Sequence, residues 1–224
     1  MNDWKRISET PATDEFLSRT ILAGAKTDAE RDRQEFRFWA FCVGRWLLPN
    51  ATDGWWVRVP YHVGPGSTGK TFLFERILAP LHGREELAAV TQDEALGDPF
   101  FLDRLLHEGR TRAWLCDGIS RNRFPWPLLQ PLLGESMFVD RQAEDGYIAD
   151  PKEFPVGQFA GNVDPHNFGS AARRLLVFEY NEPLSPDVAA RLAREVATET
   201  EAVRRKGLAA HEEFVRRAID DATE

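Results

Sequence analysis

The chain has 224 residues, a formal net charge of −8 and a sequence pI near 5.3. This length suits one domain with a modest appendage, and 42% hydrophobic with 29% charged residues is ordinary for a soluble globular protein. An acidic chain has no bulk attraction for nucleic acid or for an anionic membrane, so a constitutive basic nucleic-acid binder is disfavoured.

Targeting and redox signals indicate a soluble protein that is not secreted. The first residues lack the apolar core of a signal peptide, and no run approaches the roughly 20 apolar residues that span a bilayer. Cys42 and Cys116 both lie in apolar runs, which favours reduced, buried thiols in an intracellular protein. The scattered histidines have no metal-ligand spacing, so a structural zinc is not expected.

The chain begins with helical patterns. A short helix is expected around residues 15–23, and apolar residues at spacings of three and four predict a longer one over residues 28–48. After a turn, residues 55–63 have the apolar, β-prone composition of a strand. Pro60 cannot donate to a ladder, so we expect this strand to be short or to begin near Tyr61, with His62 as a satisfied core or edge histidine.

The next stretch carries the most specific motif. It reads Gly64-Pro65-Gly66-Ser67-Thr68-Gly69-Lys70-Thr71, which fits the phosphate-loop pattern G-x-x-x-x-G-K-[ST]. Glycines let successive backbone N–H groups approach phosphates, Lys70 would reach the β- and γ-phosphates, and the Thr71 hydroxyl would hold Mg²⁺. A helical pattern follows and ends before Pro80, so the helix dipole would also face the phosphates. The sequence therefore predicts that the chain binds a nucleoside triphosphate.

Further along, an apolar strand over residues 113–117 ends in Asp117, which lies 47 residues after Lys70. A phosphate-loop enzyme needs an acid at a strand tip to complete the magnesium shell. Other strands are expected over residues 87–91, 156–160 and 175–178, with a helical piece from Asp98 to about residue 106.

Three other segments complete the expected architecture. Prolines allow only short or broken helices over residues 123–134, and residues 137–139 and 146–148 predict a hairpin. Ser185 and Pro186 are typical of a helix start, and this helix is expected to end at Gly207 before a second one. Strands alternating with helices predict an α/β fold with a mostly parallel sheet covered on both faces.

The order of these elements resembles the superfamily 3 helicases, of the papillomavirus and parvovirus replicative type, over residues 36–183. Residues 134–141 (GESMFVDR) resemble the segment that leads into the family's DNA-contacting hairpin. Residues 154–165 resemble the run that contains its polar sensor, with Asn162 at the sensor position. Arg174 before the apolar run 175–180 resembles its arginine that reaches a neighbouring subunit's nucleotide.

This resemblance implies an AAA+-like, three-layer P-loop NTPase fold that binds ATP and Mg²⁺. By that likeness Asn162 would orient the attacking water. Arg174 (or Arg173) would act in trans as an arginine finger, which requires a homo-oligomer, a hexameric ring in the family. Arg141 would contact DNA. From the residues alone, Asn162 could instead be a turn residue, Arg173 and Arg174 a solvated strand entry, and Arg141 a cross-strand ion-pair partner.

The sequence departs from the family in three ways. The family has two adjacent acids where Asp117 stands alone between Cys116 and Gly118. Residues 135–153 hold six acidic side chains against two basic ones, and such a hairpin would repel a phosphate backbone. No origin-binding domain precedes the motor, and the oligomerisation collar is reduced to about the first 50 residues.

These features support two hypotheses. The first is an ATP-hydrolysing, superfamily 3 helicase-like motor that acts on single-stranded DNA in viral or mobile-element replication, in the cytoplasm or nucleus of an infected cell. The second is a helicase-derived ATP-binding protein that unwinds weakly or not at all and works through nucleotide-dependent assembly and protein contacts. The expected division is a helical N-terminal segment (1–54), an ATPase core (55–183) and C-terminal helices (184–224).

Overall fold

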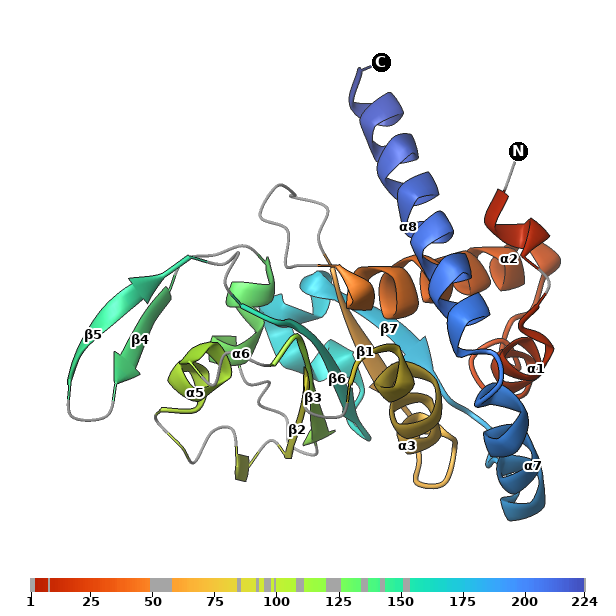
Figure 1. Cartoon of the computed structure of the whole chain (residues 1–224), viewed down its shortest axis with the longest axis horizontal. Coiled ribbons are helices and arrows are strands. Elements are labelled where there is room, and N and C mark those ends of the chain that lie inside the picture. Colours follow the sequence, from red (N-terminus) through yellow and green to blue (C-terminus); the bar gives the residue numbers. More distant parts are fainter. Residues whose placement is uncertain are drawn as a thin grey trace. The chain divides into compact units, whose positions relative to one another are not determined.

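The protein is described here from a computed structural model (Figure 1). The structure describes residues 3–7, 9–48, 58–83, 86–91, 93–94, 98, 100–107, 111–119, 126–133, 137–141, 144–150 and 154–223. No helix among these residues is long and apolar enough to cross a membrane. Residues 55–57, which belong to the strand expected before the phosphate loop, lie outside the described residues.

A five-stranded parallel sheet with the order β2-β3-β6-β1-β7 forms the centre of the fold. β2 pairs with β3, β3 pairs with β6, and β6 pairs with β1, each in parallel. The expected strands are confirmed, as is the α/β class with a mainly parallel sheet. The strands are β1 (Val59–Val63), β2 (Leu87–Thr91), β3 (Ala113–Ile119), β6 (Val156–Gly161) and β7 (Leu175–Glu179).

β1 is a short strand of 5 residues, which confirms one of the two alternatives expected here; it includes Pro60 and does not begin near Tyr61. The first described partner of β6 along β1 is Tyr61, which lies opposite Phe159. Pro60 therefore precedes the described ladder with β6, where its lack of an N–H costs least. His62 is buried as expected, with Nε2 2.8 Å from Oε1 of Gln158 and its ring stacked on Phe178.

The expected hairpin is also confirmed, as a separate two-stranded antiparallel sheet. It consists of β4 (Met137–Arg141) and β5 (Glu144–Ala149), with Val139 opposite Tyr147. Val139 and Ala149 are buried in a small cluster with Phe154. The helical pieces around it are short: α5 (Phe101–His107), α6 (Trp126–Leu129) and a 3-10 turn (Pro131–Leu133).

The chain divides into two compact units that do not follow chain order. Unit 1 contains Met1–Leu48, Pro65–Leu81 and Glu179–Glu224, and unit 2 contains Pro49–Gly64 and His82–Phe178. The core of unit 2 is built on the sheet and on the 3-10 helical segment Pro165–Arg174. Its largest buried members are Trp114, Tyr61, Phe101, Phe159 and Phe168.

Unit 1 is helical. It begins with a 3-10 turn (Asp3–Arg6) and α1 (Pro11–Arg19), which starts earlier than the helix expected over residues 15–23. The helix expected over residues 28–48 is confirmed as α2 (Asp28–Arg37), which continues as a π-helix (Phe38–Gly44) and a 3-10 turn (Arg45–Leu47). The helix after the phosphate loop is α3 (Lys70–Phe72), continued as a π-helix (Leu73–Leu78) and a 3-10 turn (Ala79–Leu81) that includes Pro80.

The C-terminal helices differ from the expectation. Ser185 does cap α7 (Pro186–Val196), and its Oγ accepts a hydrogen bond from the Val188 N–H at 3.4 Å. However, α7 ends ten residues before Lys206, and Gly207 lies inside α8 (Thr200–Thr223) rather than ending a helix. A Cβ at Gly207 would lie 2.4 Å from Cγ1 of Val43. Gly207 therefore lets α8 pack closely on the Phe38–Gly44 helix, which Figure 1 shows crossing it.

Candidate phosphate-binding site

The phosphate-loop motif joins the end of β1 to the start of α3. Its backbone is turned by Ser67 and Gly69, which have φ of 64° and 97°. Gly69 precedes the first helical residue in a left-handed conformation that a side chain would strain. The strand, tight loop and helix start are the local structure that the motif predicts.

Hydrogen bonds hold the loop in this shape within unit 1. The carbonyl oxygen of Pro65 accepts from Nζ of Lys70 at 2.7 Å and from Oγ1 of Thr68 at 2.9 Å. The carbonyl oxygen of Ser67 accepts from the Leu184 N–H at 2.9 Å. The Lys70 ammonium is thus folded back over its own loop, and the segment before α7 braces the loop.

Helix α1 supports the loop in a way that the sequence did not indicate. A Cβ at Gly69 would lie 3.0 Å from Cε2 of Phe16 and 3.3 Å from Cγ2 of Thr20. The ring of Phe16 also stacks on Phe72, the last residue of α3, with centroids 5.0 Å apart. Gly69 is therefore required both for its left-handed backbone and for the space that Phe16 takes up beside it. The apolar periodicity of α1 does not indicate that Phe16 contacts the loop.

In unit 2, Asp117 lies near the carboxyl end of β3, as expected, but the strand continues to Ile119. The ladder between β3 and β6 is irregular from Cys116 to Ile119, where Gly118 has φ of 76°. Oδ1 of Asp117 accepts a hydrogen bond from the Gly118 N–H at 2.6 Å. Burial and the neighbouring Asp117 charge raise the pKa of the Cys116 thiol to about 12, so Cys116 stays a neutral, buried thiol.

Asn162 follows β6 and is brought to the same edge of the sheet as Asp117, because β3 and β6 are parallel neighbours. Its N–H donates to the carbonyl oxygen of Ile119 at 3.2 Å. The N–H of Gly64, the first motif residue, donates to the carbonyl oxygen of Gly161 at 3.3 Å. We call this the carboxyl edge, where β1, β3 and β6 end. The side chain of Asn162 is exposed there.

A second carboxylate lies one strand away. Thr91 at the end of β2 is the register partner of Asp117, and Oε2 of Glu94 accepts from its N–H and Oγ1, both at 2.8 Å. These bonds hold the pKa of Glu94 below its usual range. Thr91 and Glu94 have the spacing and reciprocal bonds of a capping box, so we assign Glu94 to helix capping. The sequence does carry this Thr-x-x-Glu signal.

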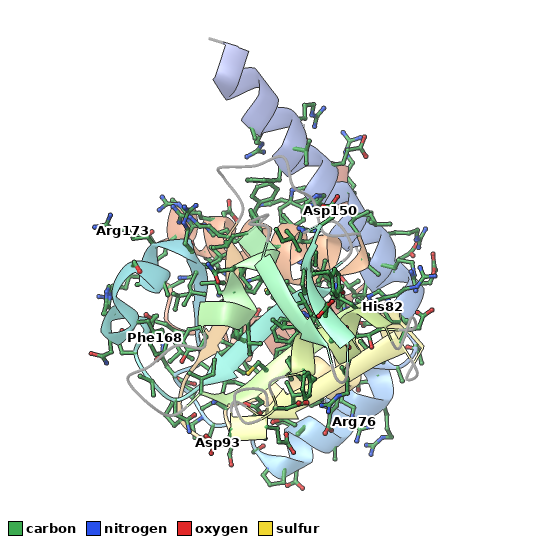
Figure 2. The ribbon with its side chains drawn as sticks, turned by 90° about the vertical axis from the view of Figure 1, so that its left-hand side faces the viewer. Arg76, His82, Asp93, Asp150, Phe168 and Arg173 are labelled. Atoms are coloured by element: carbon green, nitrogen blue, oxygen red, sulfur yellow. The ribbon has the colours of Figure 1, made fainter. Side chains whose placement is uncertain are left out.

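Arg173 and Arg174 are exposed and immediately precede β7. Because β7 is parallel to the other strands, they lie at the amino edge of the sheet, opposite Asp117 and Asn162. Figure 2 agrees, because it shows Arg173 far from Asp93, which follows β2 at the carboxyl edge. Within one copy, the structure therefore does not bring Arg174 to these two residues.

Arg141 ends β4, where its backbone pairs with Glu144 across the hairpin, and its side chain lies outside the described residues. Asp145 and Asp150 on the same hairpin are exposed, and so is 74% of Ile148. The described part of the hairpin is acidic and partly apolar.

The oxygen donors suit a magnesium ion better than a transition metal. The carboxylate of half-buried Asp117 and the exposed hydroxyl of Thr71 are hard ligands, and Mg²⁺ in nucleotide sites is held by one or two carboxylates together with phosphates. Within the described part of the chain, no group of three or more His, Cys, Asp or Glu side chains could hold a metal by itself. Each of these oxygens is therefore of the kind that Mg²⁺ takes together with the phosphates of a nucleotide.

Comparisons with known proteins give a fold likeness alone. No family profile and no curated protein matches the chain. Among solved structures, the A-form apo structure of the NrS-1 C-terminal region is similar over 89% of this chain and 44% of that one, with 14% identity and a TM-score of 0.52. A second structure of the same region covers 90% of this chain and 45% of that one, with 14% identity and a TM-score of 0.48. The chain spans less than half of each of these two solved chains.

Proposed function

We propose that this chain is an ATP-binding and ATP-hydrolysing motor of superfamily 3 helicase type, which acts on DNA in viral or mobile-element replication. The observation that carries the proposal is the phosphate loop, where all the motif positions are filled and a left-handed Gly69 leads directly into a helix that begins at Lys70. A chance match would not also need the strand, the tight turn and the helix start.

In this proposal the loop and Lys70 hold the triphosphate. Lys70 exchanges the Pro65 carbonyl for phosphate oxygens, which are stronger, charged acceptors. Thr71 and Asp117 hold Mg²⁺, which when bound neutralises charge on the phosphates. The exposed amide of Asn162 holds the attacking water from the carboxyl edge. These residues bind and orient the reactants, which is most of what phosphoryl transfer needs from a protein.

Arg174 is proposed to act in trans, within a homo-oligomer of the ring type. Its place at the amino edge supports this role, because one copy does not bring it to its own Asp117 and Asn162. An exposed guanidinium at the start of β7 is free to approach the nucleotide of a neighbouring copy. There it would stabilise charge that spreads over the transferring phosphoryl group.

The second candidate is a helicase-derived ATP-binding protein that works through nucleotide-dependent assembly and protein contacts. The specific observation that favours it is the hairpin, where exposed Asp145, Asp150 and Ile148 suit protein contacts better than a phosphate backbone. The lone acid at position 117 also favours slow turnover.

The decisive experiment is steady-state ATP hydrolysis over a protein concentration series, with and without single-stranded DNA, and with Lys70→Ala as the blank. Specific activity that rises with protein concentration and again with DNA supports the motor. Hydrolysis at a rate that DNA does not change supports the ATPase activity and contradicts the helicase function. Binding without turnover supports the second candidate, and no binding at all overturns both.

A further inference from the structure

The phenol of Tyr61 joins the middle of the sheet to the loop that carries Asn162. Tyr61 lies on β1 and is fully buried, opposite Phe159 of β6. Its hydroxyl donates a hydrogen bond to the carbonyl oxygen of Val163 at 2.7 Å. Val163 follows Asn162 directly, so the bond ends one residue from the amide that the proposed function places against water.

The surrounding contacts leave this loop little freedom. A Cβ at Gly161 would lie 2.9 Å from the Tyr61 hydroxyl and 2.2 Å from the carbonyl oxygen of Ile119. The Asn162 N–H is held by that same Ile119 carbonyl at 3.2 Å. Backbone bonds therefore fix Asn162 on its β3 side, and the Tyr61 hydroxyl fixes the residue that follows it.

Burial favours the neutral form of the Tyr61 hydroxyl, which can donate a hydrogen bond. Loss of solvent raises the pKa of Tyr61 well above its usual value, against a smaller lowering by the bond to Val163. The neutral phenol, which has a hydrogen to donate, is therefore the favoured form at neutral pH. A buried hydroxyl that lost its partner would cost free energy, which ties the loop to this one arrangement.

We propose that Tyr61 is the positioning residue for Asn162, and that its hydroxyl sets where the sensor amide stands at the carboxyl edge. The inference rests on the proposed function, because it assigns Asn162 to the attacking water. Tyr61, from the strand that leads into the phosphate loop, would thereby join the residues that the proposed function assigns to ATP hydrolysis. A displacement of about 1 Å at such a position costs up to roughly 100-fold in rate.

The alternative is that Tyr61 is only a core aromatic. Its ring packs edge-to-face on Phe168, with centroids 5.5 Å apart, inside the largest cluster of unit 2. The two roles separate cleanly, because Tyr61→Phe removes the hydroxyl and keeps the ring. Phe168→Leu does the reverse, since it weakens the ring contact and keeps the hydroxyl.

The test is a double-mutant cycle on ATP hydrolysis with Tyr61→Phe, Asn162→Ala and the pair. Tyr61→Phe is expected to lower kcat about 10-fold and to change KM less than twofold. Asn162→Ala should lower kcat roughly 100-fold. Adding Tyr61→Phe to Asn162→Ala should then change kcat less than twofold, because the hydroxyl acts through the amide that is gone.

Two controls complete the experiment. Phe168→Leu should lower the melting temperature and leave kcat within twofold, and Tyr180→Phe, which removes a buried hydroxyl in unit 1, should also leave kcat within twofold. Two outcomes overturn the positioning role of Tyr61 and leave the proposed ATPase function standing. In the first, the wild type is active and Tyr61→Phe has the same kcat. In the second, Tyr61→Phe lowers kcat equally in the wild type and in Asn162→Ala. A wild type that binds but never hydrolyses ATP overturns the motor, and the role of Tyr61 with it.

Discussion

Nζ of Lys70 lies 2.7 Å from the carbonyl oxygen of Pro65, so the lysine closes its own loop by a charge-assisted hydrogen bond. In the proposed function, a triphosphate would displace that carbonyl, because phosphate oxygens carry full negative charge and are stronger acceptors. The loop is also held by Leu184 and by Phe16, which lie outside it in the sequence. The shape of the loop backbone is therefore held by contacts from outside the motif as well as by the motif's own residues.

Lys70→Ala should lower ATP affinity or turnover by roughly 100-fold or more, because the triphosphate loses its main counter-charge. Fluorescence titration with a labelled ATP analogue and steady-state hydrolysis both measure the effect. Lys26→Ala is a matched control, because Lys26 is an exposed lysine of the same unit. Equal ATP binding by the two variants would show that the loop does not hold phosphates.

Gly207→Ala should destabilise the protein by about 1–3 kcal/mol through overpacking. The added Cβ would lie 2.4 Å from Cγ1 of Val43 and 3.0 Å from the Gly44 nitrogen, in a contact between two helices. Thermal unfolding should show a melting temperature lower by roughly 2–4 °C per kcal/mol.

Gly24→Ala is the control for this prediction. Its Cβ would meet the side-chain amide of Asn181 at 2.8 Å, which is the end of a side chain that can turn away. An unchanged melting temperature in Gly207→Ala would mean that α8 does not pack closely on the Phe38–Gly44 helix.

Local chemistry predicted much of this fold. The phosphate loop, the hairpin and the parallel strands follow from glycine spacing, turn residues and apolar runs of four to six residues. Ser185 and Pro186 predicted the start of α7 correctly because a cap is a local hydrogen bond. The carboxyl edge follows from the same logic, since parallel strands that end in polar residues must present them together.

The failures all involve contacts between distant parts of the chain. Gly207 has the residue type of a helix stop, but the close approach of Val43 and Gly44 gives it a packing role instead. For Pro60, a short strand was the correct alternative and a start near Tyr61 was not. The described ladder to β6 begins at Tyr61, so Pro60 can lie in the strand without donating to that ladder. The support of the loop by Phe16, and the bond from Tyr61 to Val163, join segments that no sequence period connects.

Stability should fall as the pH drops below the usual histidine pKa of 6.5, because of His211 on α8. Burial lowers its pKa, with a smaller lowering by Arg45, and the bond from Nδ1–H to the Ala40 carbonyl at 3.1 Å opposes this only in part. The folded state therefore prefers neutral imidazole, while the unfolded chain takes up a proton near pH 6.5. The contribution is full above that pH and is lost as the pH falls through the lower folded-state pKa.

The measurement is the free energy of unfolding in urea at pH 7.5, 6.5 and 5.5. His211→Gln keeps a donor for the Ala40 carbonyl but does not titrate, so its pH dependence should be weaker than that of the wild type. His166→Gln, which changes an exposed histidine, is the matched control for the loss of one histidine. A steeper loss in His211→Gln than in the wild type would contradict this assignment.

If Arg174 acts in trans as proposed, Arg174→Ala should lower kcat about 1,000-fold in the assembled protein and leave ATP binding to isolated subunits within twofold. The physical reason is that Arg174 lies at the amino edge of the sheet and would act on the nucleotide of a neighbouring copy. Mixing supplies the sharper test. Arg174→Ala subunits retain Lys70, and Lys70→Ala subunits retain Arg174, so a mixture of two inactive variants creates some intact composite sites. Hydrolysis should reappear and reach its maximum near equal amounts, whereas an arginine that acts in cis would leave every mixture inactive.

Arg173→Ala, mixed with Lys70→Ala in the same way, separates the two neighbouring arginines. The arginine whose loss is rescued by mixing is the one that acts on the nucleotide of the next subunit.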